Sequence, residues 1–154
     1  MRKETGDLYK LRQNILAVVD GLTLDELNEV PKGFNNNIIW NLAHMVAAQQ
    51  GVCYRRAGLP MLLEEKFLSE FMPGTKPEKF YDQDFVDQTK QNLLKTIDQF
   101  DEDLKNQAFG NYEIWTTRYG VEIKNIEDML QFLFFHEGLH SGYIMALKRA
   151  IRKD

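Results

Sequence analysis

Four stretches of the chain carry apolar side chains at every third or fourth position, the spacing that gathers them on one face of an α-helix. These stretches span residues 5–21, 38–57, 82–107 and 125–152. Polar residues fill most of the positions between, so each stretch predicts an amphipathic helix with one buried stripe. Four such helices joined by long crossover connections predict an all-α protein built as a four-helix bundle.

The segments between these helices carry local signals of their own. Thr23 and Glu26 have the spacing of a capping box, which predicts a short helix directly after Thr23. Residues 59–81 form a long connection, and a helical piece is expected within it over 62–71. Residues 108–124 lack a helical period and are rich in β-prone side chains, which predicts an extended crossover or a small hairpin.

Length and composition are those of one folded domain, which we place over residues 1–154. Hydrophobic residues make up 44% of the chain and charged residues 27%, a balance that argues against disorder. The formal net charge of −4 gives no reason to expect a nucleic-acid partner. A few basic residues gather near the end of the last predicted helix, where cations suit the helix dipole.

The cysteine content and the hydropathy pattern bear on the compartment. Cys53 is the only cysteine, so no disulfide can form within the chain, which favours a reducing environment. We expect its thiol to be buried and unreactive. The first residues lack the apolar segment of a signal peptide, and no stretch approaches 18 uninterrupted apolar residues. The sequence therefore predicts a cytoplasmic protein with no membrane partner.

The chain contains three histidines, His44, His136 and His140, and all three fall on predicted helices. Because four residues separate His136 from His140, their side chains leave one helix face about 6 Å apart along its axis. Both imidazoles can then reach one ion at a metal–nitrogen distance of about 2.0–2.1 Å. With His44 on a second helix, the three predict a site for a divalent metal ion such as zinc, nickel or iron. Three protein ligands leave a coordination position for water or substrate.

The histidines also have a simpler interpretation. A histidine on an apolar helix face is often a hydrogen-bonded core residue, and pairs four residues apart are common on helices. Spacing alone therefore leaves open both a shared metal ion and a metal-free core. The segment 136–140 reads His-Glu-Gly-Leu-His, which is not the zinc-protease motif. No glycine-rich phosphate loop is present, and no catalytic serine triad can be argued.

Two segments resemble the DinB-like superfamily, which includes the YfiT-like bacillithiol transferases and the mycothiol-dependent maleylpyruvate isomerases. Residues 39–45, Ile-Trp-Asn-Leu-Ala-His-Met, are similar to the family's aromatic-x-x-x-His element on its second helix. Residues 135–144, Phe-His-Glu-Gly-Leu-His-Ser-Gly-Tyr-Ile, are similar to its His-Glu-x-x-His-x-Gly-Gln-Ile element on the last helix. The resemblance extends over essentially the whole chain in helix order.

This resemblance implies an up-down-down-up bundle, often dimeric, whose metal ligands correspond to His44, His136 and His140. It implies a metal-dependent enzyme that transfers a low-molecular-weight thiol to a small electrophile or hydrolyses a small substrate. The expected partners are thus a small-molecule substrate, a thiol among them, and a second copy in a homodimer. The alternative is a non-enzymatic, stress-associated helical dimer in which metal is absent or only braces the bundle.

Further residues near the histidines are candidates for the site. Glu137 could serve as a general base or accept a hydrogen bond from an imidazole, and an ion-pair role fits it equally. Tyr143 stands where many members of the family have Gln, and its hydroxyl could donate to a bound water or substrate, or simply pack. Asn41 is a weaker candidate to orient a ligand. If the crossover folds over the end of the bundle, Trp115 or Tyr112 could wall the site.

Overall fold

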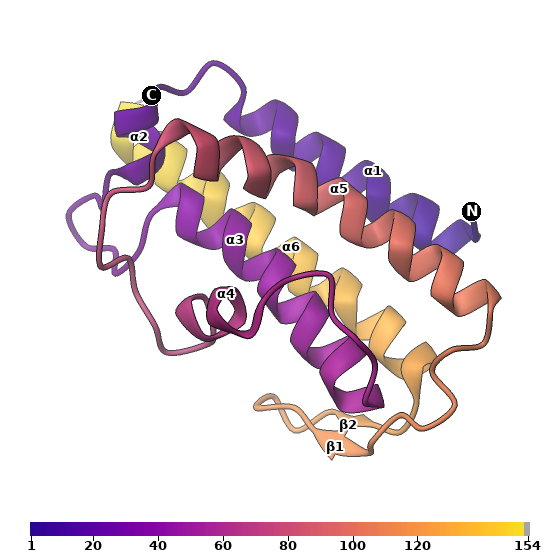
Figure 1. Ribbon diagram of the computed structural model, residues 1–154. Coiled ribbons are helices and arrows are strands. Elements are labelled where there is room, and N and C mark those ends of the chain that lie inside the picture. Colours follow the sequence, from indigo (N-terminus) through magenta and orange to yellow (C-terminus); the bar gives the residue numbers. More distant parts are fainter. Residues whose placement is uncertain (153–154) are drawn as a thin grey trace.

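Four long helices lie side by side in the structure (Figure 1). The computed structural model describes residues 1–152. The long helices are α1 (Lys3–Val19), α3 (Ile38–Gln49), α5 (Gln83–Lys105) and α6 (Ile126–Arg152). The shorter elements are α2 (Leu24–Asn28), the π-helical turn η1 (Gln50–Tyr54), the 3₁₀ turn η2 (Arg55–Ala57), α4 (Glu65–Glu70), β1 (Trp115–Thr116) and β2 (Glu122–Ile123). The predicted all-α fold is confirmed, with one very small sheet added.

Contacts between side chains fix the relative directions of the helices. The guanidinium of Arg2, just before α1, pairs with Glu127 in the first turn of α6, so α1 and α6 run the same way. The backbone N–H of Arg2 also donates to Asp101 near the end of α5, so α5 runs opposite to α1. Asn41 early in α3 contacts His140 in the second half of α6, so these two helices are antiparallel. The colour gradient in Figure 1 shows the same directions.

The helix ends follow the local signals in the sequence. Thr23 and Glu26 form the predicted capping box, with Glu26 N–H donating to Thr23 Oγ1 at 3.2 Å and Thr23 N–H donating to Glu26 Oε2 at 2.7 Å. Asn37 caps α3 by accepting from the backbone N–H of Trp40 at 2.9 Å. Gly58 ends the run that α3 begins, with a φ of 67° that glycine adopts without a steric penalty.

The second predicted helix is one helical run whose interior changes character. After Gln49 the chain continues through the π turn η1 and the 3₁₀ turn η2 before Gly58 stops it. A π turn inserts an extra residue into a helix, and such turns are frequent at functional sites. Here the turn is held by the buried side chain of Gln50, whose Oε1 accepts from the backbone N–H of Leu62 at 2.8 Å. The long connection after Gly58 is thus attached to the end of α3.

The core lies along the inner faces of the four helices. Its fully buried apolar residues include Leu8, Val19, Ile38, Leu42, Val46, Val86, Leu93, Ile97, Phe100 and Leu147. Most outward positions are polar, although Phe135, Leu139 and Met145 are exposed on α6. No helix within residues 1–152 is long and apolar enough to cross a membrane. The bundle therefore follows the amphipathic pattern from which it was predicted.

A buried ion pair crosses the middle of this core. Arg12 on α1 is 0% exposed and Glu137 on α6 is 1% exposed, and Arg12 Nη2 lies 2.8 Å from Glu137 Oε1. Arg12 Nη1 also donates to the carbonyl of Leu93 at 2.8 Å and to Thr96 Oγ1 at 3.0 Å on α5. A charge enclosed in this way is tolerated only when its donors are satisfied. The pair therefore connects three helices at one level of the bundle.

Removing one member of this pair should destabilise the fold severely. In Glu137→Gln the Arg12 charge stays buried without its counter-ion, so we expect the free energy of unfolding to fall by about 3–5 kcal/mol. Urea denaturation followed by far-UV circular dichroism measures the loss. The double variant Arg12→Met/Glu137→Met, which leaves no buried charge, should recover most of it. A loss below about 1 kcal/mol in the single variant, typical of an exposed pair, contradicts this account.

The segment between α5 and α6 forms a small hairpin over one end of the bundle (Figure 1). Trp115 pairs with Ile123 and Thr116 with Glu122, antiparallel. Gly120 supplies the positive φ, 79°, that the turn requires. This confirms the small hairpin expected over 108–124. The tip residues Arg118 and Tyr119 line the same cavity as His44 and His136, which makes the hairpin the roof of the site described next.

Candidate metal centre

The antiparallel packing of α3 against α6 brings the three histidines together. His44 Nε2 and His136 Nε2 are 3.3 Å apart, and one ring nitrogen from each of His44, His136 and His140 lies within 4.8 Å of the others. Two nitrogens bound to one tetrahedral ion at about 2.0–2.1 Å are separated by roughly 3.3 Å. The cluster therefore has the dimensions of a three-histidine metal site, reached with only small movements of the rings.

Hydrogen bonds on the far side of two rings fix their tautomers. His44 Nδ1 donates to the backbone carbonyl of Phe71 at 2.6 Å, and His140 Nδ1 donates to Asn41 Oδ1 at 2.9 Å. With the proton on Nδ1, each ring presents the lone pair of Nε2 toward the cluster. His44 is also stacked on Trp40, with ring centroids 4.9 Å apart and an interplanar angle of 7°. Both rings are thus oriented as metal ligands are.

Two buried ring nitrogens of the cluster have no hydrogen-bond partner in the part of the chain that the structure describes. Among residues 1–152, no hydrogen-bond partner approaches the buried His140 Nε2 or His136 Nδ1. A buried nitrogen without a partner is costly and calls for an explanation. A divalent cation shared by the three rings would supply one for His140 Nε2, and it would take the place of the hydrogen bond between His44 Nε2 and His136 Nε2. The residues present therefore fit a divalent metal ion.

Burial also keeps the three imidazoles in the form that binds metal. Desolvation lowers the pKa of His44, and it lowers the pKa of His136 to about 2 and that of His140 to about 3. Neighbouring histidines and the positive charge of Arg118 push the last two values in the same direction. Neutral imidazole is the metal-binding form, so no proton has to leave these rings near neutral pH.

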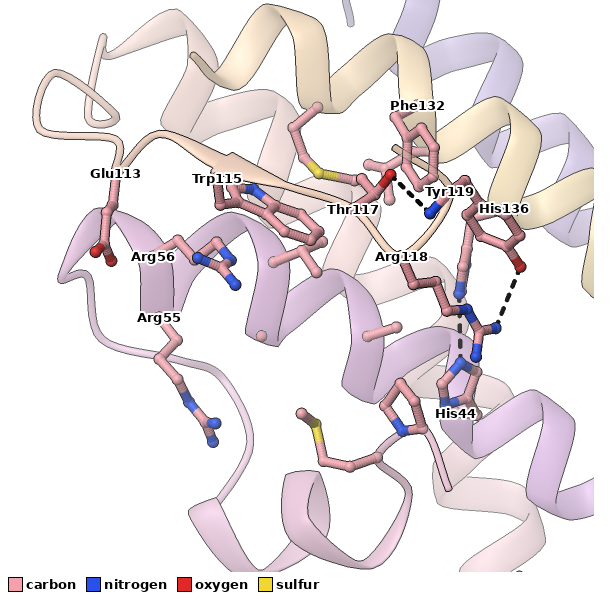
Figure 2. Close-up of a pocket in the computed structure, with 17 residues that line it drawn as sticks. His44, Arg55, Arg56, Glu113, Trp115, Thr117, Arg118, Tyr119, Phe132 and His136 are labelled. Carbon is pink, nitrogen blue, oxygen red and sulfur yellow. Dashed lines mark hydrogen bonds between the residues drawn. The ribbon is translucent and has the colours of Figure 1, made fainter. Parts of the chain in front are cut away.

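A cavity of about 520 Å³ opens beside the histidines (Figure 2). His44 and His136 form part of its wall, η1 contributes another part, and the hairpin closes it from above. The remaining lining residues are Ala48, Gly51, Val52, Arg55, Arg56, Met72, Pro73, Glu113, Trp115, Thr117, Arg118, Tyr119, Met129, Phe132 and Leu133. The volume is in the range of small-molecule sites, and the lining is mostly apolar with a few charged groups.

A family comparison agrees with this geometry. The model of the DinB superfamily matches residues 7–144, a range that includes all three histidines and the helices that carry them. The chain belongs to the DinB superfamily. No curated protein and no solved structure gave a match to it. The homodimer expected from the family resemblance stays a prediction.

The other candidate residues of this DinB-superfamily chain differ in how close they lie to the histidines and the cavity. Glu137 points into the core toward Arg12 rather than lining the cavity. Tyr143 packs edge-on against Phe34, with ring centroids 5.5 Å apart, and is likewise not part of the cavity wall. Their proposed roles in the chemistry stay predictions. Asn41, the weaker candidate, accepts a hydrogen bond from His140 and so orients that candidate ligand.

The hairpin supplies the functional candidates that the sequence did not single out. Trp115 lines the cavity as expected, whereas Tyr112 lies behind it and accepts a hydrogen bond from Trp115 Nε1 at 3.0 Å. Arg118 and Tyr119 reach the histidines only because the hairpin folds back over the helix ends (Figure 2).

Cys53 is fully buried, and burial raises the pKa of its thiol, in keeping with the expected unreactive side chain.

Metal content should depend on His140 and, less strongly, on Asn41. We expect protein purified without a histidine tag to bind one divalent ion per chain, and His140→Ala to bind none. Asn41→Ala should weaken binding by about 10–100-fold, because it removes the acceptor that orients His140. Elemental analysis and competition with a chromophoric chelator measure both effects. Equal metal content in His140→Ala and the unmodified protein excludes the site.

The metal-free protein should lose stability as the pH falls below about 6.5. The folded-state pKa values of His136 and His140 lie below those of the unfolded chain, so the unfolded chain takes up protons first. Each histidine then lowers the free energy of unfolding by up to about 1.4 kcal/mol per pH unit, down toward its folded-state pKa. Urea denaturation in a chelator at several pH values measures the slope. His136→Leu, which lacks one such group, should give a shallower slope, and parallel curves contradict the prediction.

Proposed function

We propose that the protein is a divalent-metal-dependent enzyme that acts on a small molecule, either transferring a low-molecular-weight thiol to an electrophile or hydrolysing the substrate. One observation carries the proposal. Three neutral imidazoles, two with tautomers set by hydrogen bonds, face a common point at the wall of a cavity of about 520 Å³. Membership in the DinB superfamily agrees with a metal-associated role.

The histidines would hold the ion, and the cavity would hold the substrate beside it. All-imidazole sites suit zinc, nickel and iron. When bound, such an ion lowers the pKa of a coordinated water or thiol and polarises an electrophile. The chain's own residues keep the ligands neutral and oriented, and the apolar walls of the cavity limit the access of water.

The alternative, a metal that only braces the bundle, finds less support in the geometry. A structural zinc site is normally closed by four protein ligands. Within residues 1–152, the group of histidine, cysteine and acidic side chains able to share an ion comprises three members. The cluster also borders a cavity rather than the filled core, and the bundle already has the Arg12–Glu137 pair and its apolar core to hold it together. An open coordination position therefore favours a catalytic role for the metal ion over a structural one.

Turnover should require both the metal and the histidines. Protein loaded with zinc, nickel or iron(II) is assayed for conjugation of cysteamine to 1-chloro-2,4-dinitrobenzene and for hydrolysis of 4-nitrophenyl acetate. We expect at least one reaction to exceed the rate of the same metal in buffer, and the excess to vanish in His140→Ala and after chelation. Circular dichroism establishes that the variant is folded.

Two matched variants test the remaining candidates in the same assays. Tyr143→Phe keeps the ring that packs on Phe34 and removes only the hydroxyl, so a wild-type rate takes Tyr143 out of the chemistry. Arg12→Met/Glu137→Met removes the Glu137 carboxylate without leaving a buried charge, so a wild-type rate in this variant takes Glu137 out of the chemistry. If the metal raises the melting temperature but no reaction exceeds the metal-in-buffer control, the bracing role replaces the enzymatic one.

A further inference from the structure

The roof of the cavity places one positive charge directly beside the histidines. The guanidinium of Arg118 lies next to His44 and His136 in Figure 2, and its Nη2 donates to the hydroxyl of Tyr119 at 3.2 Å. The charge acts on the whole cluster, since Arg118 lowers the pKa of His44, His136 and His140 alike. Arg118 is therefore part of the environment of any ion that the three rings hold.

Within residues 1–152, no negatively charged side chain forms an ion pair with this group. Among the described residues, no carboxylate lies within ion-pair distance of Arg118, whereas Arg55 on the same cavity is paired with Glu65. Glu113 is the only carboxylate of the cavity wall, and Figure 2 shows it at the other end, beyond Trp115. Neutral imidazoles add no charge, so a divalent ion beside Arg118 would bring three positive charges together. Arg118 is exposed at the rim of the cavity, so solvent weakens this repulsion, and an anionic ligand bound between the ion and the guanidinium relieves the rest.

The rest of the cavity is suited to an apolar group. Its walls include Val52, Met72, Trp115, Met129, Phe132 and Leu133. The Arg56 guanidinium lies over the Trp115 ring, 4.0 Å from its centroid, and so holds the far wall in place rather than standing next to Arg118. A ligand that fills this space needs an apolar body at one end and a negative group at the other.

We propose that the substrate is a small organic acid with an apolar body, whose carboxylate is bound by Arg118 beside the three histidines. One guanidinium presents a planar pair of donors that matches a carboxylate, which carries the single charge that Arg118 balances. The other cations of the cavity wall, Arg55 and Arg56, lie at the other end of the cavity (Figure 2), so Arg118 is the side chain of the wall that presents this pair of donors beside the histidines. The inference rests on the proposed function, of which it names the substrate class.

Calorimetry on zinc-loaded protein tests the inference with a pair of matched probes. 3-Phenylpropanoate and 3-phenylpropanamide share one apolar body and differ in charge, so the acid should bind more tightly than the amide. In Arg118→Gln the affinity for the acid should fall by about 10–100-fold, the loss expected for a hydrogen-bonded charge pair, while the affinity for the amide stays the same. Arg118→Lys keeps the positive charge but lacks the paired donors of a guanidinium, so its affinity for the acid should lie between those of Arg118→Gln and the unmodified protein.

Lys124→Gln is the matched control variant. It removes one positive charge from the same hairpin region, but Lys124 pairs with Glu122 and does not line this cavity. Its affinities for acid and amide should equal those of the unmodified protein, and zinc content is measured for every sample. A fall in acid affinity as large as in Arg118→Gln would indicate an effect of net charge alone and overturn the inference.

Two further results also overturn it. One is equal affinity of the unmodified protein for the acid and the amide, which needs no variant to be folded. The other is unchanged acid affinity in Arg118→Gln, which would mean that the metal alone binds the carboxylate. These experiments measure binding, so their outcome does not depend on whether the protein catalyses a reaction. Arg118-dependent binding without metal-dependent turnover keeps this site and rejects the proposed reaction, and turnover with Arg118-independent binding rejects this inference alone.

Discussion

The buried guanidinium of Arg12 imposes a constraint that all four long helices meet. A charge enclosed in an apolar core must have its donors satisfied from every side. It contacts Glu137 on α6, two groups on α5, and more distantly, at 3.4 Å, the carbonyl of Met45 on α3. Met45 directly follows His44, and Glu137 directly follows His136. The groups that satisfy the charge therefore also set the level at which two of the candidate ligands face each other.

The orientation of the ligands depends on parts of the chain that are far from them in sequence. The acceptor for His44 is the backbone carbonyl of Phe71, at the end of α4 in the long connection between α3 and α5. The acceptor for His140 is the side chain of Asn41, one turn before His44 on α3. A backbone acceptor tolerates changes of side chain as long as the connection keeps its path, whereas a side-chain acceptor depends on one residue. The two halves of the cluster are thus held by different means.

Periodicity and capping signals were enough to predict the helices, because each depends on residues close in sequence. They also placed the three histidines on helix faces. The three rings face one another only because α3 packs on α6, and the spacing of residues along the chain does not predict that packing. Arg12 lies on the apolar stripe between Leu8 and Ile15, and a charge in such a position is itself a signal of a buried ion pair. Arg118 carried no such signal, since its position depends on how an aperiodic segment folds over the helix ends. The contact of Tyr143 with Phe34 could not be predicted either, since it joins α6 to the chain before α3.

The residues that would hold the ion and those that would contact the substrate belong to different kinds of structure. The histidines sit on two long helices whose packing is tied to the core, whereas much of the cavity roof comes from a hairpin whose ladder contains two residue pairs. Side chains at its tip can change without moving the ligands, because little of the core rests on them. Selectivity for a substrate can then diverge while the metal chemistry is kept. For protein engineering, the exposed tip residues Arg118 and Tyr119 are the positions at which to change what is recognised.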